Sequence, residues 1–166
     1  MIRPAKTSDA KILHDGFTRV VDEGRWLPSL KANASVQDWV SWIARTSYTR
    51  EVILVAFIEE NYVGHLTLQP EEWMASGHVA KLGIIVQEEH RNKGVGRALM
   101  NTAEDIAVEM EYEKIILSTF HNNKIANALY FSLGYKKVGI RKSHFKMPDG
   151  YIDEVLMEKH LISKNA

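Results

Sequence analysis

Residues 78–110 combine three features in a fixed order, and this order restricts the folds open to the chain. The apolar run HVAKLGIIV at 78–86 favours a strand, although it contains Gly83. A polar loop with two glycines, HRNKGVG, follows at 90–96. After this loop, apolar residues recur at helical spacing: Leu99, Ala103, Ile106 and Met110. We therefore predict a strand, a glycine loop and a helix that begins at the glycines.

The glycine loop suits an anionic ligand. The first amides of a helix have no partner inside the helix, and the helix dipole adds partial positive charge there. Gly94 and Gly96 permit positive φ and let the amides come close to a ligand. Arg91, Lys93 and Arg97 add the formal charge that a multiply charged phosphate needs. The competing interpretation is that the two glycines only form a tight turn from strand to helix.

Three phosphate compounds compete for this loop. A nucleoside triphosphate loop needs four residues between its glycines, followed by Lys and Ser or Thr, but here only Val95 intervenes. A dinucleotide loop needs a third glycine where this chain has Leu99, and a βαβ setting that the upstream hairpin does not supply. The third candidate, the pyrophosphate of coenzyme A, depends on a resemblance carried by the wider sequence.

Helical and strand patterns alternate along the remaining sequence. A first helix is expected to begin with Asp9 as its N-cap and to end at Gly24, and a second to follow the capping box SVQD at 35–38. A further helix is expected within 122–135, closed by Gly134. Strands are expected at Ile2–Arg3, in a hairpin at 51–70, at 113–120, and at about 135–146 and 151–159. This order predicts an α+β fold with a mixed, largely antiparallel central sheet and about four flanking helices.

Composition sets limits on partners and location. The 166 residues contain 21 Lys plus Arg and 21 Asp plus Glu, so we expect neither a nucleic-acid nor a membrane partner. The absence of cysteine removes disulfides and thiolate metal sites, and no metal is expected. The first ten residues, MIRPAKTSDA, are too polar for a signal peptide, and no apolar run reaches the roughly 20 residues needed to span a bilayer. We therefore expect a cytoplasmic protein. We expect one domain at 1–162 and a tail at 163–166.

Several motifs together carry a family resemblance. Arg91 to Gly96 match the pattern R/Q-x-x-G-x-G/A, and NxxAxxLYxxxGY extends from Asn123 to Tyr135. The opening IRPA, the hairpin segment VGHLTL and the strand LGIIV stand in the corresponding places. The chain thereby resembles the GNAT N-acetyltransferase superfamily over nearly its whole length, especially the branch of bacterial amino-acid and protein N-terminal acetyltransferases. This resemblance implies a GNAT-like single domain and an acyltransferase that uses acetyl-CoA as donor.

The resemblance also implies roles for individual residues. Tyr130 corresponds to the family's general acid near the thioester sulfur, and Asn123 to an asparagine that helps to bind the donor. Spacing alone places Asn123, Asn127 and Tyr130 on one helix face, and the alternative is that Tyr130 is an amphipathic core residue. The expected acetyl-CoA site consists of Ile84, Ile85, Val86, Arg91, Asn92, Lys93, Gly94, Val95, Gly96, Arg97, Asn123, Asn127 and Tyr130.

Backbone amides are the expected oxyanion donors. A strand distorted near Gly83 can leave N–H groups unpaired, and we assign them to Ile85 and Val86. In similar proteins this strand splays from the next one, and the pantetheine arm enters between them like an added strand. The general base stays open among Glu71, Glu72, His78, His121 and a water molecule.

The acceptor is predicted only as a class. In the family, recognition falls to the segment between the first two helices and to the last hairpin, here Arg25–Pro28, Trp73 and about 144–151. Trp26 and Trp73 would wall a pocket or simply anchor loops. We expect an amino acid or small primary amine that attacks directly in a ternary complex. Alternatives are a peptide N-terminus, a polyamine, or a non-catalytic acyl-CoA sensor, and a homodimer is possible.

Overall fold

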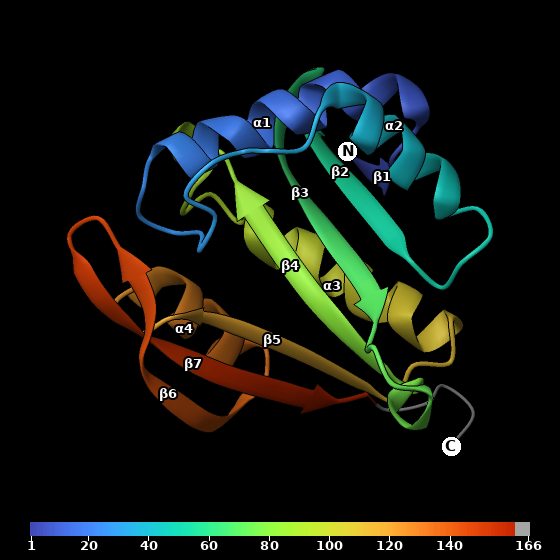
Figure 1. The fold of residues 1–166 in the computed structure, drawn as a ribbon. Helices are drawn as coiled ribbons and strands as arrows, with labels where there is room; N and C mark the ends of the chain where they lie inside the picture. Colours follow the sequence, from blue (N-terminus) through green and yellow to red (C-terminus); the bar gives the residue numbers. More distant parts are fainter. Residues whose placement is uncertain (162–166) are drawn as a thin grey trace.

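The β-rich runs of the sequence pair into one sheet. The computed structural model of the chain describes residues 1–161, and within them seven strands follow the order β1-β2-β3-β4-β5-β7-β6 (Figure 1). In that part of the chain β4 and β5 are the one parallel pair. The predicted mixed, largely antiparallel sheet is therefore confirmed. The strands are β1 (Ile2–Pro4), β2 (Val52–Ile58), β3 (Asn61–Pro70), β4 (Val79–Val86), β5 (Lys114–Phe120), β6 (Lys136–Met147) and β7 (Gly150–His160).

Helices cover both faces of the sheet. α1 and α2 pack on one face, and α3 and α4 pack on the other (Figure 1). Three short 3-10 turns, η1 (Thr7–Asp9), η2 (Met74–Ser76) and η3 (Glu88–His90), lie in the connections. None of the helices found in residues 1–161 has both the length and the apolar character needed to cross a membrane. The α-helices are α1 (Ala10–Asp22), α2 (Val36–Arg45), α3 (Val95–Glu109) and α4 (Lys124–Ser132).

The sheet divides the hydrophobic core into two parts. In β2, Ile53 and Val55 pack toward α1 and α2, where Trp39 is also buried. Leu54, between them in sequence, packs on the opposite face with Leu99 of α3. Because successive strand residues point to opposite faces, a strand buried on both sides must be apolar throughout. This is why β2 has no polar residue.

A glycine in α1 allows close contact between this helix and the sheet. A Cβ atom on Gly16 would overlap the ring of Tyr62 in β3, well inside any normal contact distance from its Cε1 atom. The missing side chain therefore lets the tyrosine ring pack directly against the helix backbone.

β4 and β5 separate soon after they meet. Their pairing covers three residues of each strand, Val79 to Lys81 against Lys114 to Ile116. Beyond Lys81, β4 continues alongside β3, and β5 continues alongside β7 (Figure 1). The sheet thus opens into a wedge-shaped gap between two well-paired halves.

The structure corrects two local predictions. The pairing of β3 with β4 runs from Gly64 opposite Val86 to Pro70 opposite Ala80 without a register shift, so β4 is not distorted at Gly83. The gap arises because β4 and β5 diverge. Asp9 does not cap α1 with its side chain; its carboxylate accepts hydrogen bonds from the Lys6 amide and from Arg3.

Other boundaries agree more closely with the sequence. The capping box of Ser35 and Asp38 is present at the start of α2. α4 is shorter than the predicted segment 122–135, with Asn123 as its N-cap and Gly134, at a φ of 88°, just beyond its end. The predicted boundary between a domain at 1–162 and a tail at 163–166 lies outside the described residues.

Gly64→Ala is expected to destabilise the junction of β3 and β4. A Cβ atom there would lie 2.5 Å from the backbone oxygen of Ile85, which cannot rotate away. We expect a loss of about 1–3 kcal/mol in the free energy of unfolding, measured by urea denaturation. Gly139→Ala is the control, because nothing lies within 4 Å of a Cβ atom at that strand position. Equal stability of the two variants would contradict this packing argument.

Candidate functional site

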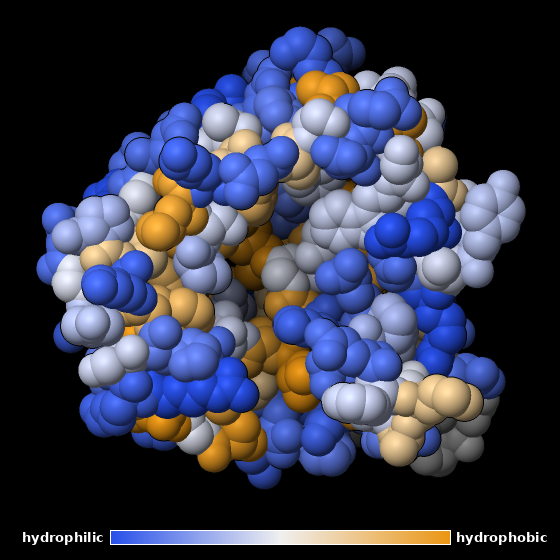
Figure 2. Space-filling model, viewed as in Figure 1, coloured by the Kyte–Doolittle hydropathy of each residue, from blue (hydrophilic) through white to orange (hydrophobic). Residues whose placement is uncertain are grey.

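The gap between β4 and β5 contains a large cavity. Its volume is about 780 Å³, within the usual range for ligand sites. Figure 2 shows a hollow in the viewed face, with apolar residues inside it and polar residues around it. The lining comes from the α1–α2 connection, β4, the glycine loop, the end of β5, α4 and Phe145 of β6. Elements from both halves of the sheet therefore meet around this space, which we call the gap cavity.

The glycine loop forms one end of the gap cavity. Gly94 has a φ of 82° and is the N-cap of α3, a backbone conformation that favours glycine. A Cβ on Gly94 would meet nothing within 4 Å, whereas one on Gly96 would lie 3.1 Å from Leu129. The first intrahelical bond runs from the Ala98 amide to Gly94, so the preceding amides are not used by the helix. The loop thus presents free N–H groups, as an anion site requires.

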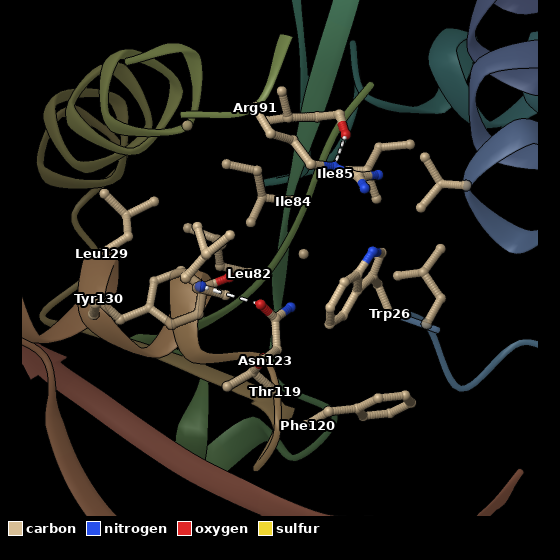
Figure 3. A pocket seen from close by; sticks show the side chains of 18 of the residues that line it. Trp26, Leu82, Ile84, Ile85, Arg91, Thr119, Phe120, Asn123, Leu129 and Tyr130 are labelled. Carbon is tan, nitrogen blue, oxygen red and sulfur yellow. Dashed lines mark hydrogen bonds between the residues drawn. The ribbon is translucent and has the colours of Figure 1, made fainter. Parts of the chain in front are cut away.

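Arg91 serves the framework of the loop. Its guanidinium makes two hydrogen bonds to Glu23, at 2.7 and 2.5 Å, and its Nε donates to the Val86 oxygen at 2.9 Å (Figure 3). Burial alone would raise the pKa of Glu23, but the bonds and charge of Arg91 outweigh burial and lower it. The positive charge of Arg91 is therefore already paired.

α4 contributes the polar groups on the other side of the gap cavity. Asn123 lines the cavity while its Oδ1 accepts from the Ala126 amide at 3.1 Å (Figure 3). Asn127 does not line it, because its side-chain nitrogen donates to the backbone oxygens of Phe120 and Asn123. The helix face predicted from sequence spacing is therefore only partly turned toward the cavity.

Tyr130 combines burial with access to the gap cavity. The residue is 6% exposed and lines the cavity, opposite Trp26 (Figure 3). Its hydroxyl has no hydrogen-bond partner among residues 1–161. Burial raises the pKa of this hydroxyl to about 12, so it keeps its proton at neutral pH. A buried, protonated phenol at a cavity wall can donate a proton or a hydrogen bond.

Backbone pairing shows which amides of β4 face the gap. At the ends of the β3–β4 pairing, the Gln87 amide donates to Val63, and the Glu71 amide donates to Val79. Because the direction alternates along a strand, the amide of Ile85 also points toward β3. It is therefore not the donor to the gap that we predicted. The amides of Ile84 and Val86 point toward the gap, beyond the last pair with β5.

The structure brings together most of the predicted site. Three predicted residues do not line the gap cavity: Lys93, Val95, which is buried in the core, and Asn127. The four candidate bases, Glu71, Glu72, His78 and His121, do not line it either. The predicted residues that do line it are Ile84, Ile85, Val86, Arg91, Asn92, Gly94, Gly96, Arg97, Asn123 and Tyr130.

Several lining residues were not predicted. Ser118, Thr119 and Phe120 follow the point at which β5 leaves β4, and His90 precedes the glycine loop. The sequence feature that could have identified residues 118–120 is their position at the end of the strand predicted at 113–120, where loops often carry site residues. Of the two tryptophans proposed as walls, Trp26 lines the gap cavity, whereas Trp73 is 75% exposed and does not line it.

Comparisons with known proteins agree with this geometry. The model of the acetyltransferase (GNAT) family matches residues 20–135. The L-amino acid N-acetyltransferase AaaT of Escherichia coli (strain K12) is 31% identical over 107 residues, covering 64% of this chain and 66% of AaaT. Human N-acetyltransferase 8 is 33% identical over 87 residues, covering 51% of this chain and 38% of its own. The chain thus spans about two thirds or less of these two relatives.

A solved structure shows the same fold. The putative acetyltransferase yncA from Salmonella typhimurium, determined with its cofactor acetyl-CoA, superposes with a TM-score of 0.91. The match covers 100% of this chain and 96% of that protein at 16% sequence identity. At this identity the likeness concerns the fold.

Glu23→Gln is expected to destabilise the end of β4. The change leaves the guanidinium of Arg91 without its carboxylate, and both side chains are largely buried, at 21% and 13% exposure. We expect a loss of about 1–3 kcal/mol in the free energy of unfolding at pH 7. Because Glu23 has a lowered pKa, the pair stabilises the fold above the ordinary carboxyl pKa, and this contribution disappears as the pH falls through the lowered value.

Glu88→Gln is the matched control. Glu88 bonds to Arg25 at 2.9 Å, but its side chain is 66% exposed, so its removal should change stability little. Urea denaturation of both variants at several pH values measures how much the Glu23–Arg91 pair and the Glu88–Arg25 pair each contribute to the free energy of unfolding. Equal losses, or a Glu23 effect that persists at pH 2, would contradict the assignment.

Proposed function

Because this chain belongs to the acetyltransferase (GNAT) family, we propose that it transfers an acetyl group from acetyl-CoA to a primary amine. The family expected from the sequence is confirmed, and with it the acyltransferase class. The observation that carries the proposal for this chain is the gap cavity, which joins the free amides of the glycine loop to the hydroxyl of Tyr130.

The loop fits the pyrophosphate of coenzyme A. Gly94 and Gly96 open the start of α3, and the unused amides there are suited to phosphate oxygens. Arg97 lines the same end of the gap cavity, and its partner within residues 1–161 is the neutral hydroxyl of Ser132, so its charge is available for a phosphate. When bound, acetyl-CoA supplies the activated thioester.

The free edge of β4 fits an extended arm. The amides of Ile84 and Val86 point into the gap where β5 has left, so an amide-containing chain can pair with them as an added strand. Such donors also stabilise the negative charge that develops on a carbonyl oxygen during acyl transfer. We assign this role to Val86 and Ile84 in place of Ile85.

Tyr130 is the proposed general acid. The thiolate that leaves during the transfer needs a proton, and a phenol of raised pKa inside the cavity carries one at neutral pH. A protein that only senses acyl-CoA has no need for an acid at this position, so Tyr130 favours an enzyme over a sensor. Since no candidate carboxylate lines the gap cavity, we propose that the amine enters uncharged or loses its proton to water.

The acceptor is proposed to be an amino acid or another small amine. The relative AaaT is named as an L-amino acid N-acetyltransferase, which supports this class. Among the described residues 1–161, no aspartate or glutamate lines the gap cavity, whereas a polyamine site needs carboxylates, so a polyamine is less suited. A peptide N-terminus is the second candidate. Direct transfer in a ternary complex, a cytoplasmic location and a single catalytic domain remain predictions.

Acetyl-CoA is expected to raise the melting temperature of the protein. At a concentration of 100 times Kd, a ligand that binds only the folded state adds about 2.7 kcal/mol of stability. Gly94→Ala should abolish most of this increase, because φ at 94 suits glycine and the loop amides would move. Gly134→Ala is the control: φ at 134 is 88°, so the strain is comparable, but Gly134 does not line the gap cavity. This variant should keep the increase in melting temperature caused by acetyl-CoA. If both variants respond like the wild type, the loop is not the binding site.

Tyr130→Phe is expected to lower kcat by about 10²- to 10⁴-fold, with little effect on acetyl-CoA binding. The reason is that the proton for the thiolate is lost while the ring still fills its place. Tyr135→Phe is the control, since Tyr135 is a buried phenol that does not line the gap cavity. Release of free coenzyme A with a panel of amines measures both. An unchanged kcat in Tyr130→Phe would remove this residue from the mechanism.

A further inference from the structure

A second cavity lies on the α1–α2 face of the sheet. Its volume is about 330 Å³, and we call it the aromatic cavity. It shares Leu27, Gly83, Ile84 and Ile85 with the gap cavity, so the two spaces adjoin across β4. Its other lining residues are Phe17, Ala34, Asp38, Trp39, Trp42, His65 and Thr67. A group bound here would extend from the place where the amine must react.

His65 is a buried polar residue in this lining, next to Trp39, whose indole nitrogen is itself fully enclosed. His65 lies opposite Ile85 in the β3–β4 pairing and is 4% exposed. Its Nδ1 is 2.6 Å from the hydroxyl of Tyr62, and its ring meets that of Trp39 edge-on at a centroid distance of 5.5 Å. Burial lowers the pKa of His65 to about 3, so the ring is neutral at physiological pH.

A chain of hydrogen bonds fixes which ring nitrogen carries the proton. The Nε of Arg19 can only donate, so the Gln87 side-chain oxygen, 2.8 Å away, must accept. The Gln87 nitrogen then donates to the Gly16 oxygen at 3.0 Å, which fixes the orientation of this amide beside Tyr62. Burial raises the pKa of the Tyr62 hydroxyl, and the positive charge of Arg19 and the nearby Gln87 amide oppose the rise.

The same chain leaves His65 as a donor toward the aromatic cavity. Among residues 1–161 the Tyr62 hydroxyl has Nδ1 of His65 as its hydrogen-bond partner, and because an imidazole nitrogen accepts more strongly than a phenol oxygen, the hydroxyl donates its proton to Nδ1. A neutral imidazole with an accepting Nδ1 carries its proton on Nε2. No hydrogen-bond partner for Nε2 exists among residues 1–161. His65 is therefore suited to donate a hydrogen bond to a ligand and unsuited to act as a base.

The surrounding residues define the group that would accept this bond. The cavity wall is formed by aromatic and aliphatic side chains, which favour a flat apolar group. Its one formally charged side chain is Asp38, whose carboxylate would repel an anion. A ligand that fills the cavity without an accepting oxygen would leave this donor unpaired, at a cost of about 1–3 kcal/mol, so a ligand that supplies the oxygen is favoured.

We propose that the acceptor amine carries an uncharged aromatic side chain with a hydrogen-bond-accepting oxygen, which occupies the aromatic cavity and binds Nε2 of His65. This inference rests on the proposed acetyltransferase function and specifies its substrate class. His65 selects and positions the acceptor, and it takes no part in proton transfer.

The test compares three amines as acceptors for the wild-type protein with acetyl-CoA. Tyramine has the oxygen, 4-methylphenethylamine has a methyl group of similar size in its place, and ethylamine lacks the ring. We expect kcat/KM for tyramine to exceed that for 4-methylphenethylamine by roughly tenfold, the value of one buried hydrogen bond. Ethylamine should be lower by a further ten- to hundredfold or so, because it leaves the apolar cavity unfilled.

Two variants separate the hydrogen bond from the packing. His65→Phe keeps a ring but removes the donor, and it should bring the ratio of tyramine to 4-methylphenethylamine close to one. Tyr62→Phe loses the same Tyr62–His65 bond and no longer fixes the tautomer, but it keeps an imidazole that can still donate from Nε2, so the ratio should fall only in part and stay above one. The thermal shift caused by acetyl-CoA, measured on each variant, reports an intact gap cavity. If His65→Phe does not fold, the wild-type ratios and tyramine binding followed by tryptophan fluorescence still decide the matter.

Different outcomes overturn different claims. Equal kcat/KM for tyramine and 4-methylphenethylamine, or a ratio that survives in His65→Phe, would overturn the role of His65. Faster reaction of ethylamine than of either ring compound would overturn the substrate class and leave the acetyltransferase function standing. If acetyl-CoA neither shifts the melting temperature nor yields coenzyme A with any amine, the proposed function fails, and this inference fails with it.

Discussion

The divergence of β4 from β5 is the constraint on which the rest of the site depends. Three residues of each strand pair, and then each strand continues with a different neighbour. Every backbone group that loses a partner in this way must find another or remain exposed to the cavity. The amides of Ile84 and Val86 are such groups, and they lie between the glycine loop and Tyr130. An interruption in the sheet thus provides both the space and the donors of the site.

Charge near the gap is divided between framework and ligand site. Arg91, part of the motif that suggested a phosphate site, is paired with Glu23 and with the backbone of Val86. Its pairing fixes the end of β4 against the end of α1, and this holds the glycine loop in place. The proposed binding of a phosphate then depends chiefly on loop amides and on Arg97, whose guanidinium has the neutral Ser132 hydroxyl as its partner within residues 1–161. A basic residue in a motif can therefore act by positioning the backbone that binds.

The sequence allowed prediction of the elements and of local motifs, because these depend on near neighbours. Hydrophobic periodicity located the strands and helices, and the capping box at Ser35 and the glycine turn at Gly94 were readable directly. The partners of buried groups were not, since Glu23 and Arg91, or Arg19 and Gln87, are far apart in the chain. For the same reason the sequence indicates no role for His65, although it offers His78 and His121 as candidate bases. A strand histidine shows no sign of facing a cavity until the opposite helices are placed.

The contact between Gly16 and Tyr62 gives α1 an influence on the chemistry of the aromatic cavity. Glycine inside a helix is unfavourable by roughly 1 kcal/mol relative to alanine. At this position a methyl group would displace the tyrosine ring whose hydroxyl directs its proton to His65. The backbone oxygen of the same glycine also helps to orient Gln87. The absence of a methyl group at Gly16 thus helps to determine which ring nitrogen of His65, on the strand beneath α1, carries the proton.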